Sequence, residues 1–160
     1  MKQAAAVVLV AAALGALIAV GYPALFPSDE RRIRKQLDQL VATIDAPPGE
    51  SFDAMARAAR IGNAFTPDVV VDFGEGGPVQ GRETVMAIAS RFQERSRTFK
   101  VALQDVDIAV SSDRASADVE LTAVVTTDDS TDAREFQLRM AKPADRWLIA
   151  RATAVRVLQK

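Results

Sequence analysis

The sequence contains no cysteine and no histidine, and it has only one tryptophan and one tyrosine. The absence of cysteine excludes disulfides and thiol chemistry in any compartment. The absence of histidine removes the side chain that most often relays protons near neutral pH. The catalytic groups available to this chain are therefore few, and a function other than catalysis has to be considered from the start.

The chain also lacks a strong excess of charge of either sign. Its 20 basic and 21 acidic residues nearly cancel, and apart from Lys2 all of them lie between Ser28 and Lys160. A nucleic-acid partner would require a strongly basic face, so none is expected. Acids dominate residues 105–132 and bases dominate residues 134–160. Adjacent strands carrying these two sets are therefore expected to pair across a sheet.

Charge is missing altogether from residues 4–21, which form one uninterrupted apolar stretch. The stretch is long enough for a membrane-spanning helix. The sequence therefore predicts a transmembrane anchor over residues 1–27 and a globular domain over residues 28–160. Two alternatives stay open: a signal peptide cleaved at the small-residue site Ala19-Val20-Gly21, and a buried helix of a soluble protein.

The apolar stretch carries small residues on one helical face. Ala11, Gly15 and Ala19 recur at four-residue intervals, a spacing that lets a second membrane helix approach closely. The hypothesis is packing against a partner helix, and the alternative is simply an alanine-rich span. A short N-terminal span followed by one domain is usually an exported arrangement, so the domain is expected on the outer side. The cations that follow residue 30 favour the opposite orientation under the positive-inside rule.

The residues after the apolar stretch predict three helices, with one short strand before the third. The first helix begins at Ser28, a suitable N-cap residue, and has Asp29 in its first turn, where an acid is favourable. It ends at the Ala46-Pro47-Pro48-Gly49 break. The other predicted ranges are 51–61 for the second helix, 69–73 for the strand and 82–95 for the third helix.

Everything after residue 98 predicts strands. Apolar residues occupy odd positions from Phe99 to Leu103 and even positions from Val106 to Val110, so a β-bulge is predicted near Gln104-Asp105. Three more strands are predicted at 115–125, 136–140 and 147–157. This order predicts the α+β fold class, with three helices packed on one face of a curved, mainly antiparallel sheet.

Two short segments resemble the nuclear transport factor 2-like superfamily, also called the SnoaL-like or cystatin-like cone fold. They are residues 65–73 (FTPDVVVDF) and residues 81–85 (GRETV). Their order of aromatic residue, turn, strand, loop and Gly-Arg-Glu helix start is similar to that of the family, and the resemblance spans about residues 29–158. It implies a cone-shaped domain with a cavity between the helices and the concave sheet, and it says little about chemistry.

The resemblance implies a site around Asp72, which matches the general-base aspartate of ketosteroid isomerases. A carboxylate in an apolar pocket has a raised pKa and can shuttle protons. The isomerases also need oxyanion donors, yet the only tyrosine, Tyr22, lies beside the apolar stretch. Arg151 is expected to point into the sheet, where it could neutralise Asp72. Asp72 is thus a weak catalytic candidate, with a polar ligand contact and a structural role as alternatives. The expected ligand pocket comprises Asp72, Phe73, Trp147 and Arg151.

Three functions are consistent with this sequence. The first is a single-pass interaction module of the bacterial inner membrane, with its domain in the periplasm, serving as an accessory or scaffold subunit that binds a protein partner or a second copy. The second is a carrier of a small apolar ligand, and the third is an isomerase or hydrolase using Asp72. No cofactor and no metal site is expected, since Asp128, Asp129 and Asp132 lack the spacing of a calcium loop.

Overall fold

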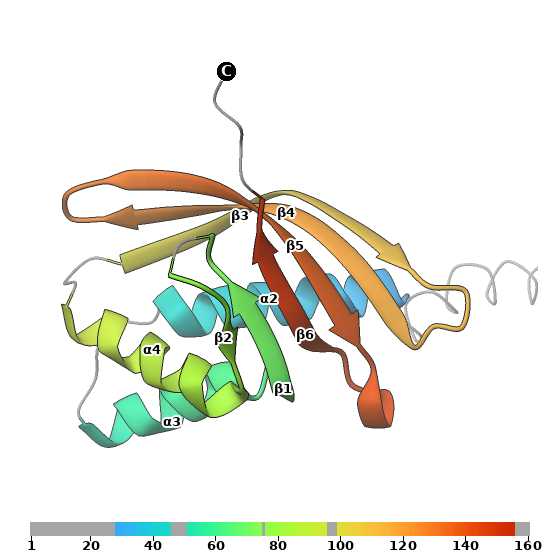
Figure 1. Cartoon of the computed structure of the whole chain (residues 1–160), viewed down its shortest axis with the longest axis horizontal. Helices are drawn as coiled ribbons and strands as arrows, with labels where there is room; N and C mark the ends of the chain where they lie inside the picture. Colours follow the sequence, from blue (N-terminus) through green and yellow to red (C-terminus); the bar gives the residue numbers. More distant parts are fainter. Residues whose placement is uncertain (1–27, 46–50, 75, 96–98, 156–160) are drawn as a thin grey trace, which may run out of the picture.

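The computed structural model describes residues 28–45, 51–74, 76–95 and 99–155, and there it places three helices on one side of a curved six-stranded sheet (Figure 1). The helices are α2 (Asp29–Asp45), α3 (Ser51–Gly62) and α4 (Arg82–Arg95). The strands are β1 (Phe65–Asp72), β2 (Val79–Gln80), β3 (Phe99–Val110), β4 (Ser116–Thr127), β5 (Thr131–Ala141) and β6 (Leu148–Ala154). A short 3₁₀ turn, η1 (Pro143–Asp145), joins β5 to β6. The predicted α+β class with three helices is confirmed.

The sheet is mixed and has the order β2-β1-β6-β5-β4-β3. Strand β1 runs parallel to β6, whereas the other neighbouring pairs are antiparallel. The four long antiparallel strands were predicted, but the parallel pair and the short β2 were not. Strand β1 lies between the short edge strand β2 and β6, so the first and last long strands of the described domain are hydrogen-bonded neighbours.

Strand β1 begins at Phe65, earlier than the predicted start at Val69. Pro67 lies within the strand and its side chain is exposed. Proline cannot donate a ladder hydrogen bond, and the register of β1 against β6 shifts between Phe65 and Val70. The proline therefore interrupts the pairing locally without ending the strand, which is why the sequence underestimated its length.

The β-bulge predicted in the long strand β3 is confirmed. The register against β4 shifts between Gln104 and Asp107, and Asp105 has a positive φ of 50°. Gln104 pairs with Thr122 and Asp107 pairs with Glu120, so β3 holds one residue more than its partner there. The bulge keeps the apolar residues on both sides of it directed toward the helices.

The core lies between the helices and the concave side of the sheet. Ile33 of α2 and Met140 of β5 are fully buried, and Trp147 is 2% exposed. Helices α3 and α4 contact each other closely, since a Cβ added to Gly62 would clash with Sδ of Met86 and lie 2.8 Å from its Cγ. Because the helices lie on this side, the opposite side of the sheet is left without a covering helix among the described residues (Figure 1).

The predicted anchor over residues 1–27, with its Ala11, Gly15 and Ala19 stripe, lies outside the described residues. None of the helices in the described part of the chain combines the length and the hydropathy that a membrane-spanning helix needs. The described fold begins at Ser28, whose Oγ accepts a hydrogen bond of 3.4 Å from the main-chain N of Arg31. This contact confirms the predicted N-cap.

Candidate functional site

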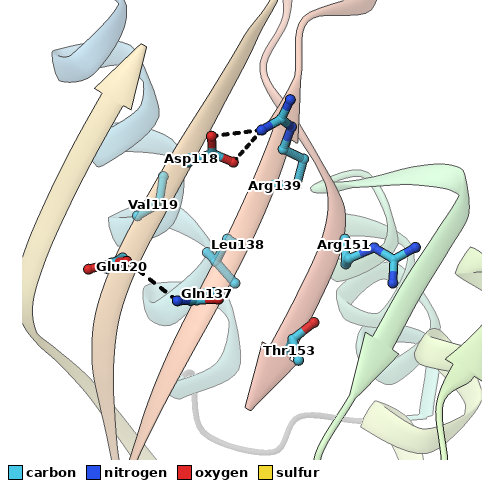
Figure 2. Close-up of a pocket in the computed structure, with 8 residues that line it drawn as sticks. All are labelled: Asp118, Val119, Glu120, Gln137, Leu138, Arg139, Arg151 and Thr153. Atoms are coloured by element: carbon cyan, nitrogen blue, oxygen red, sulfur yellow. Dashed lines mark hydrogen bonds and ion pairs between the residues drawn. The ribbon is translucent and has the colours of Figure 1, made fainter. Parts of the chain in front are cut away.

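The uncovered face of the sheet, which we call the outer face, is hollowed into a groove of about 560 Å³ (Figure 2). Side chains of a strand alternate between the two faces of a sheet. In β4 this rule directs Ala117, Val119 and Leu121 toward the core, while Asp118 and Glu120 are exposed on the outer face. The groove is lined by residues of β4, β5 and β6, namely Asp118, Val119, Glu120, Gln137, Leu138, Arg139, Arg151 and Thr153.

Charged residues of neighbouring strands pair within this groove. Nη1 of Arg139 donates to both carboxylate oxygens of Asp118, at 2.6 and 2.7 Å, and the two residues are register partners. Beside them, Nε2 of Gln137 donates to Oε1 of Glu120 at 3.4 Å. Asp118 belongs to the acidic stretch of the sequence and Arg139 to the basic one. The predicted pairing of the two stretches across the sheet is therefore confirmed at this position.

Arg151 stands apart from these pairs, as Figure 2 shows. It lies on β6 opposite Val70 of β1, and it is exposed on the outer face. Among the described residues, no carboxylate forms an ion pair with its guanidinium. The groove therefore combines a satisfied Asp118–Arg139 pair with one cation that remains available to a bound molecule.

Asp72 lies at the end of β1 in register with Thr153, on the same face of the sheet as Arg151. Its Oδ1 accepts a hydrogen bond of 2.8 Å from the main-chain N of Gly74, which holds the turn after the strand. Within the described residues, no ion pair joins Asp72 to Arg151. The residue is half-buried, and its carboxylate is used to hold the turn.

The expectation that Asp72, Phe73, Trp147 and Arg151 share one pocket needs correction. Trp147 lies in the core, whereas Arg151 lies on the outer face and does not point into the sheet as expected. The reason is a shift in register, because Met140 of β5 pairs with Ile149 while the preceding Arg139 pairs with Arg151. Phe73 is 39% exposed, and its carbonyl oxygen accepts from Nη1 of Arg134 at 3.1 Å.

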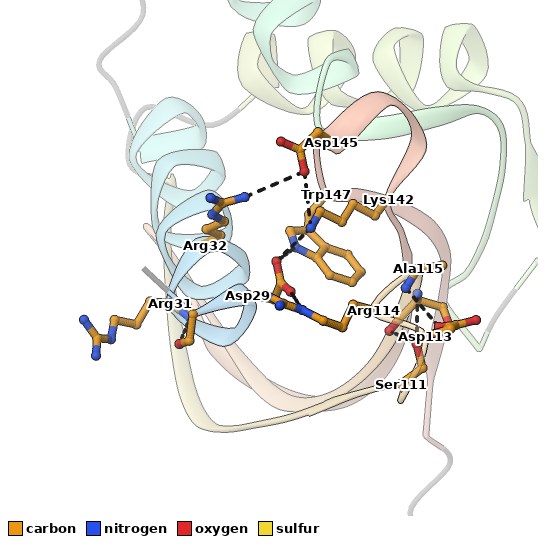
Figure 3. Close-up of polar contacts among 12 residues, drawn as sticks. Asp29, Arg31, Arg32, Ser111, Asp113, Arg114, Ala115, Lys142, Asp145 and Trp147 are labelled. Atoms are coloured by element: carbon orange, nitrogen blue, oxygen red, sulfur yellow. Dashed lines mark hydrogen bonds and ion pairs between the residues drawn. The ribbon is translucent and has the colours of Figure 1, made fainter. Parts of the chain in front are cut away.

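A polar cluster that the sequence did not predict surrounds Asp29 (Figure 3). The carboxylate of Asp29 is 3% exposed, and it accepts hydrogen bonds from Arg114 Nε at 2.7 Å, Lys142 Nζ at 3.0 Å and Trp147 Nε1 at 3.2 Å. The ammonium of Lys142 also lies 5.5 Å from the centre of the Trp147 ring. The cluster ties the start of α2 to the β3–β4 hairpin and to the turn before β6.

The same contacts determine the pKa of Asp29. Burial by itself raises the pKa of a carboxyl group. Here the hydrogen bonds from Lys142, Arg114 and Trp147 outweigh burial and bring the pKa of Asp29 down from 3.8 to about 2. Asp29 is therefore ionised at neutral pH, and it acts as a structural anion rather than as a proton donor. The sequence signal, an acid in the first turn of a helix, pointed only to the helix dipole.

The described residues hold no group of three or more acids that could bind a metal ion. On the concave side, several apolar side chains that pack against the core are only partly buried. These residues come from α2, β2, α4 and the long strands, and they are Leu40, Ile44, Val79, Ala89, Leu103, Ala123 and Phe136. The concave side thus offers apolar surface, and the outer face offers charged surface.

Comparison with known proteins identifies the family. The family model described as SnoaL-like domain matches residues 28–153. The chain belongs to the SnoaL-like domain family. This confirms the resemblance seen in residues 65–73 and 81–85. No curated protein matches the chain in sequence.

Solved structures share the fold of this SnoaL-like domain at low sequence identity. A candidate scytalone dehydratase from Novosphingobium aromaticivorans is 13% identical with a TM-score of 0.65, covering 81% of this chain and 85% of that chain. A Mycobacterium tuberculosis protein of unknown function is 20% identical with a TM-score of 0.64, covering 81% and 78%. A Nostoc punctiforme protein with a cystatin-like fold is 11% identical with a TM-score of 0.61, covering 81% and 91%. At these identities the likeness shows the fold alone.

Proposed function

We propose that this SnoaL-like domain is a binding module that recognises a protein through its outer sheet face. The observation that carries the proposal is the groove on that face, where Arg151 has no acidic partner among the described residues. The three helices all lie on the other side, so nothing described in the chain covers the groove (Figure 1). An open sheet face with a fixed pattern of charge can select a partner by electrostatic complementarity.

The charges on the outer face are ordered across the strands. Asp118 and Glu120 form an acidic row on β4, while Arg139 and Arg151 place basic groups on β5 and β6. A partner whose basic groups face β4 and whose acidic groups face β5 and β6 would bring its acids over Arg151. A second copy related by a twofold axis parallel to the strands presents this reverse order, so both a homodimer and a different partner subunit fit the face.

Catalysis is the less favoured reading because of the surroundings of Asp72. Its Oδ1 is hydrogen-bonded to the main-chain N of Gly74, and the sequence has no histidine that could relay a proton. Asp72→Asn should lower stability through the weakened turn, whereas Asp68→Asn, an exposed change on the same strand, should not. A catalytic turnover that is lost in Asp72→Asn and retained in Asp68→Asn would overturn this assignment.

The proposal includes a membrane tether in residues 1–27, because the uncharged residues 4–21 directly precede the domain. This tether would make the protein an accessory or scaffold subunit of a bacterial inner-membrane complex, with the domain in the periplasm. N-terminal sequencing of the mature protein tests the tether, and a start near Tyr22 would contradict it. Protease treatment of intact spheroplasts tests the side on which the domain lies. Gly15→Leu tests the helix-packing stripe formed with Ala11 and Ala19.

Copurification from native membranes in a gentle detergent tests the binding function. Arg151→Glu reverses the charge of the available guanidinium in the groove. This variant should no longer copurify with a partner subunit, and any homodimer should dissociate to a monomer, as measured by light scattering. Arg91→Glu is the matched control, because Arg91 is an exposed arginine on α4, away from the outer face. A wild-type protein that is strictly monomeric and brings down no partner would contradict the proposal.

A carrier of a small apolar ligand is the second candidate function. It is favoured by the partly buried apolar residues of the concave side, such as Leu40, Leu103 and Phe136. Ligand pockets are lined mainly by such side chains. Organic extraction of the purified protein, followed by mass spectrometry, should release a bound lipophilic compound if this function holds. An extract that matches the buffer blank would remove its basis.

A further inference from the structure

A second groove lies on the helical side of the domain, away from the outer face. It has a volume of about 410 Å³ and is bounded by α2, by the exit of α3 and by the turn that precedes β6. Its lining residues are Gln36, Gln39, Leu40, Ala42, Thr43, Arg60, Asn63, Ala64 and Arg146. Positions 36, 39, 40 and 43 share one face of α2, since residues three and four apart are neighbours on a helix.

The charged residues that line this groove in the described part of the chain are both basic. Arg60 and Arg146 are the charged residues among those that line it, and none of the described carboxylates does so. Nη2 of Arg146 donates to the carbonyl oxygen of Asn63 at 3.1 Å, which holds this guanidinium at the groove while its other N–H groups stay available. Arg60 has no ion-pair or hydrogen-bond partner within the part of the chain that the structure describes. Two arginines from different parts of the fold thus line one groove.

The neutral residues of the groove add hydrogen-bond donors. The side-chain amides of Gln36, Gln39 and Asn63 carry N–H groups, and all three residues line the groove. The hydroxyl of Thr43 is not one of these available donors, because it already donates to the carbonyl oxygen of Gln39 at 2.8 Å. Leu40, half-buried, supplies apolar surface between α2 and the core. The lining therefore combines cations, amide donors and a small apolar area.

We propose that this groove binds a phosphate monoester. A carboxylate carries a single negative charge, whereas a phosphomonoester carries about −1.5 to −2 near neutral pH. Two guanidinium groups without a lining acid match the larger charge, and guanidinium forks donate in pairs to phosphate oxygens. The volume of the groove leaves room for an organic group beside the phosphate, over Leu40. This site is independent of the protein interface proposed on the outer face.

Calorimetric titration of the full-length chain in gentle detergent tests the site, with glycerol 3-phosphate as the probe. Wild-type protein should bind it, and the double variant Arg60→Gln/Arg146→Gln should bind about tenfold or more weakly, since each charge-assisted contact contributes strongly. Arg60→Lys should retain part of the affinity. The single variant Arg91→Gln, an exposed arginine on α4, is the control and should bind as the wild type does.

Mixed micelles with and without phosphatidic acid show whether the phosphate monoester that binds is a lipid headgroup or a soluble compound. If added phosphatidic acid competes with glycerol 3-phosphate, the site takes a lipid headgroup; if it does not compete, the site takes a soluble phosphomonoester. Both results support the proposal. Unchanged affinity in the double variant, with thermal unfolding showing that it is folded, would overturn it, as would the absence of binding to the wild type.

Discussion

Nε1 of Trp147 donates a hydrogen bond of 3.2 Å to Oδ1 of Asp29, and this bond joins the first residue of α2 to the residue just before the last strand. The same oxygen accepts from Nζ of Lys142 at 3.0 Å. Lys142 and Trp147 both belong to the connection between β5 and β6. Asp29 therefore connects the two ends of the described domain through a buried charge.

Asp29→Asn should destabilise the domain by about 3 kcal/mol, because the largely buried Lys142 then keeps only the exposed Asp145, at 3.3 Å, as an anionic partner among the described residues. Lys142 is only 14% exposed and cannot turn fully to water, whereas Arg114 is 67% exposed and can. Urea unfolding at neutral pH measures the effect. Glu30→Gln, an exposed change in the same helical turn, is the control and should shift the midpoint little.

The depressed pKa of Asp29 predicts a loss of stability in acid. The folded pKa is about 2 and the ordinary value is 3.8, so the contribution is fully present above about pH 4. It declines as the pH falls toward 2, because protonation then favours the unfolded chain. A shift of this size corresponds to about 2 kcal/mol. Urea midpoints measured between pH 7 and pH 2 should fall less steeply in Asp29→Asn than in the wild type, and parallel curves would contradict the prediction.

Gly62→Ala should destabilise the domain by about 1–3 kcal/mol, the usual range for overpacking. The new methyl group would meet Sδ and Cγ of Met86 where α3 packs on α4. In a Met86→Ala background the same change should have a much smaller effect, because the obstructing atoms are gone. A double-mutant cycle by urea unfolding measures the coupling. Equal effects in both backgrounds would show that Met86 moves aside freely.

The bulge in β3 predicts opposite responses at two nearby aspartates. Asp105 has a φ of 50°, and a β-branched residue is strained in that region, so Asp105→Val should cost about 1–2 kcal/mol. Asp107 is exposed and paired with Glu120 in the regular ladder. Asp107→Val should therefore be neutral or slightly stabilising, since valine suits a strand. Thermal unfolding of the two variants under identical conditions compares them.

The exposed pair Asp118–Arg139 should contribute little to folding. The side chains are 62% and 55% exposed, and ion pairs in that setting are typically worth less than about 1 kcal/mol. Asp118→Asn should therefore leave the unfolding midpoint nearly unchanged while it weakens association through the outer face. A large loss of stability would instead give this pair a structural role.

Features that depend on neighbouring residues could be predicted from the sequence. The N-cap at Ser28 and the bulge at Asp105 follow from local composition and from the alternation of apolar residues. The placement of Arg151 could not be predicted, because β6 is apolar on both faces and a register shift beside Arg139 changes its alternation. The Asp29 cluster unites positions far apart in the chain, and no local pattern signals such a contact.

The parallel pairing of β1 with β6 has a consequence for the order in which the protein is made. Strand β1 is synthesised long before β6, and its neighbour in the sheet on that side is the final strand of the domain. Contacts between such distant segments form slowly, because a long loop must close first. During translation, the pairing of β1 with β6 can therefore form only after the end of the domain has left the ribosome. A stalled nascent chain lacking β6 would expose the edge of β1 to chaperones.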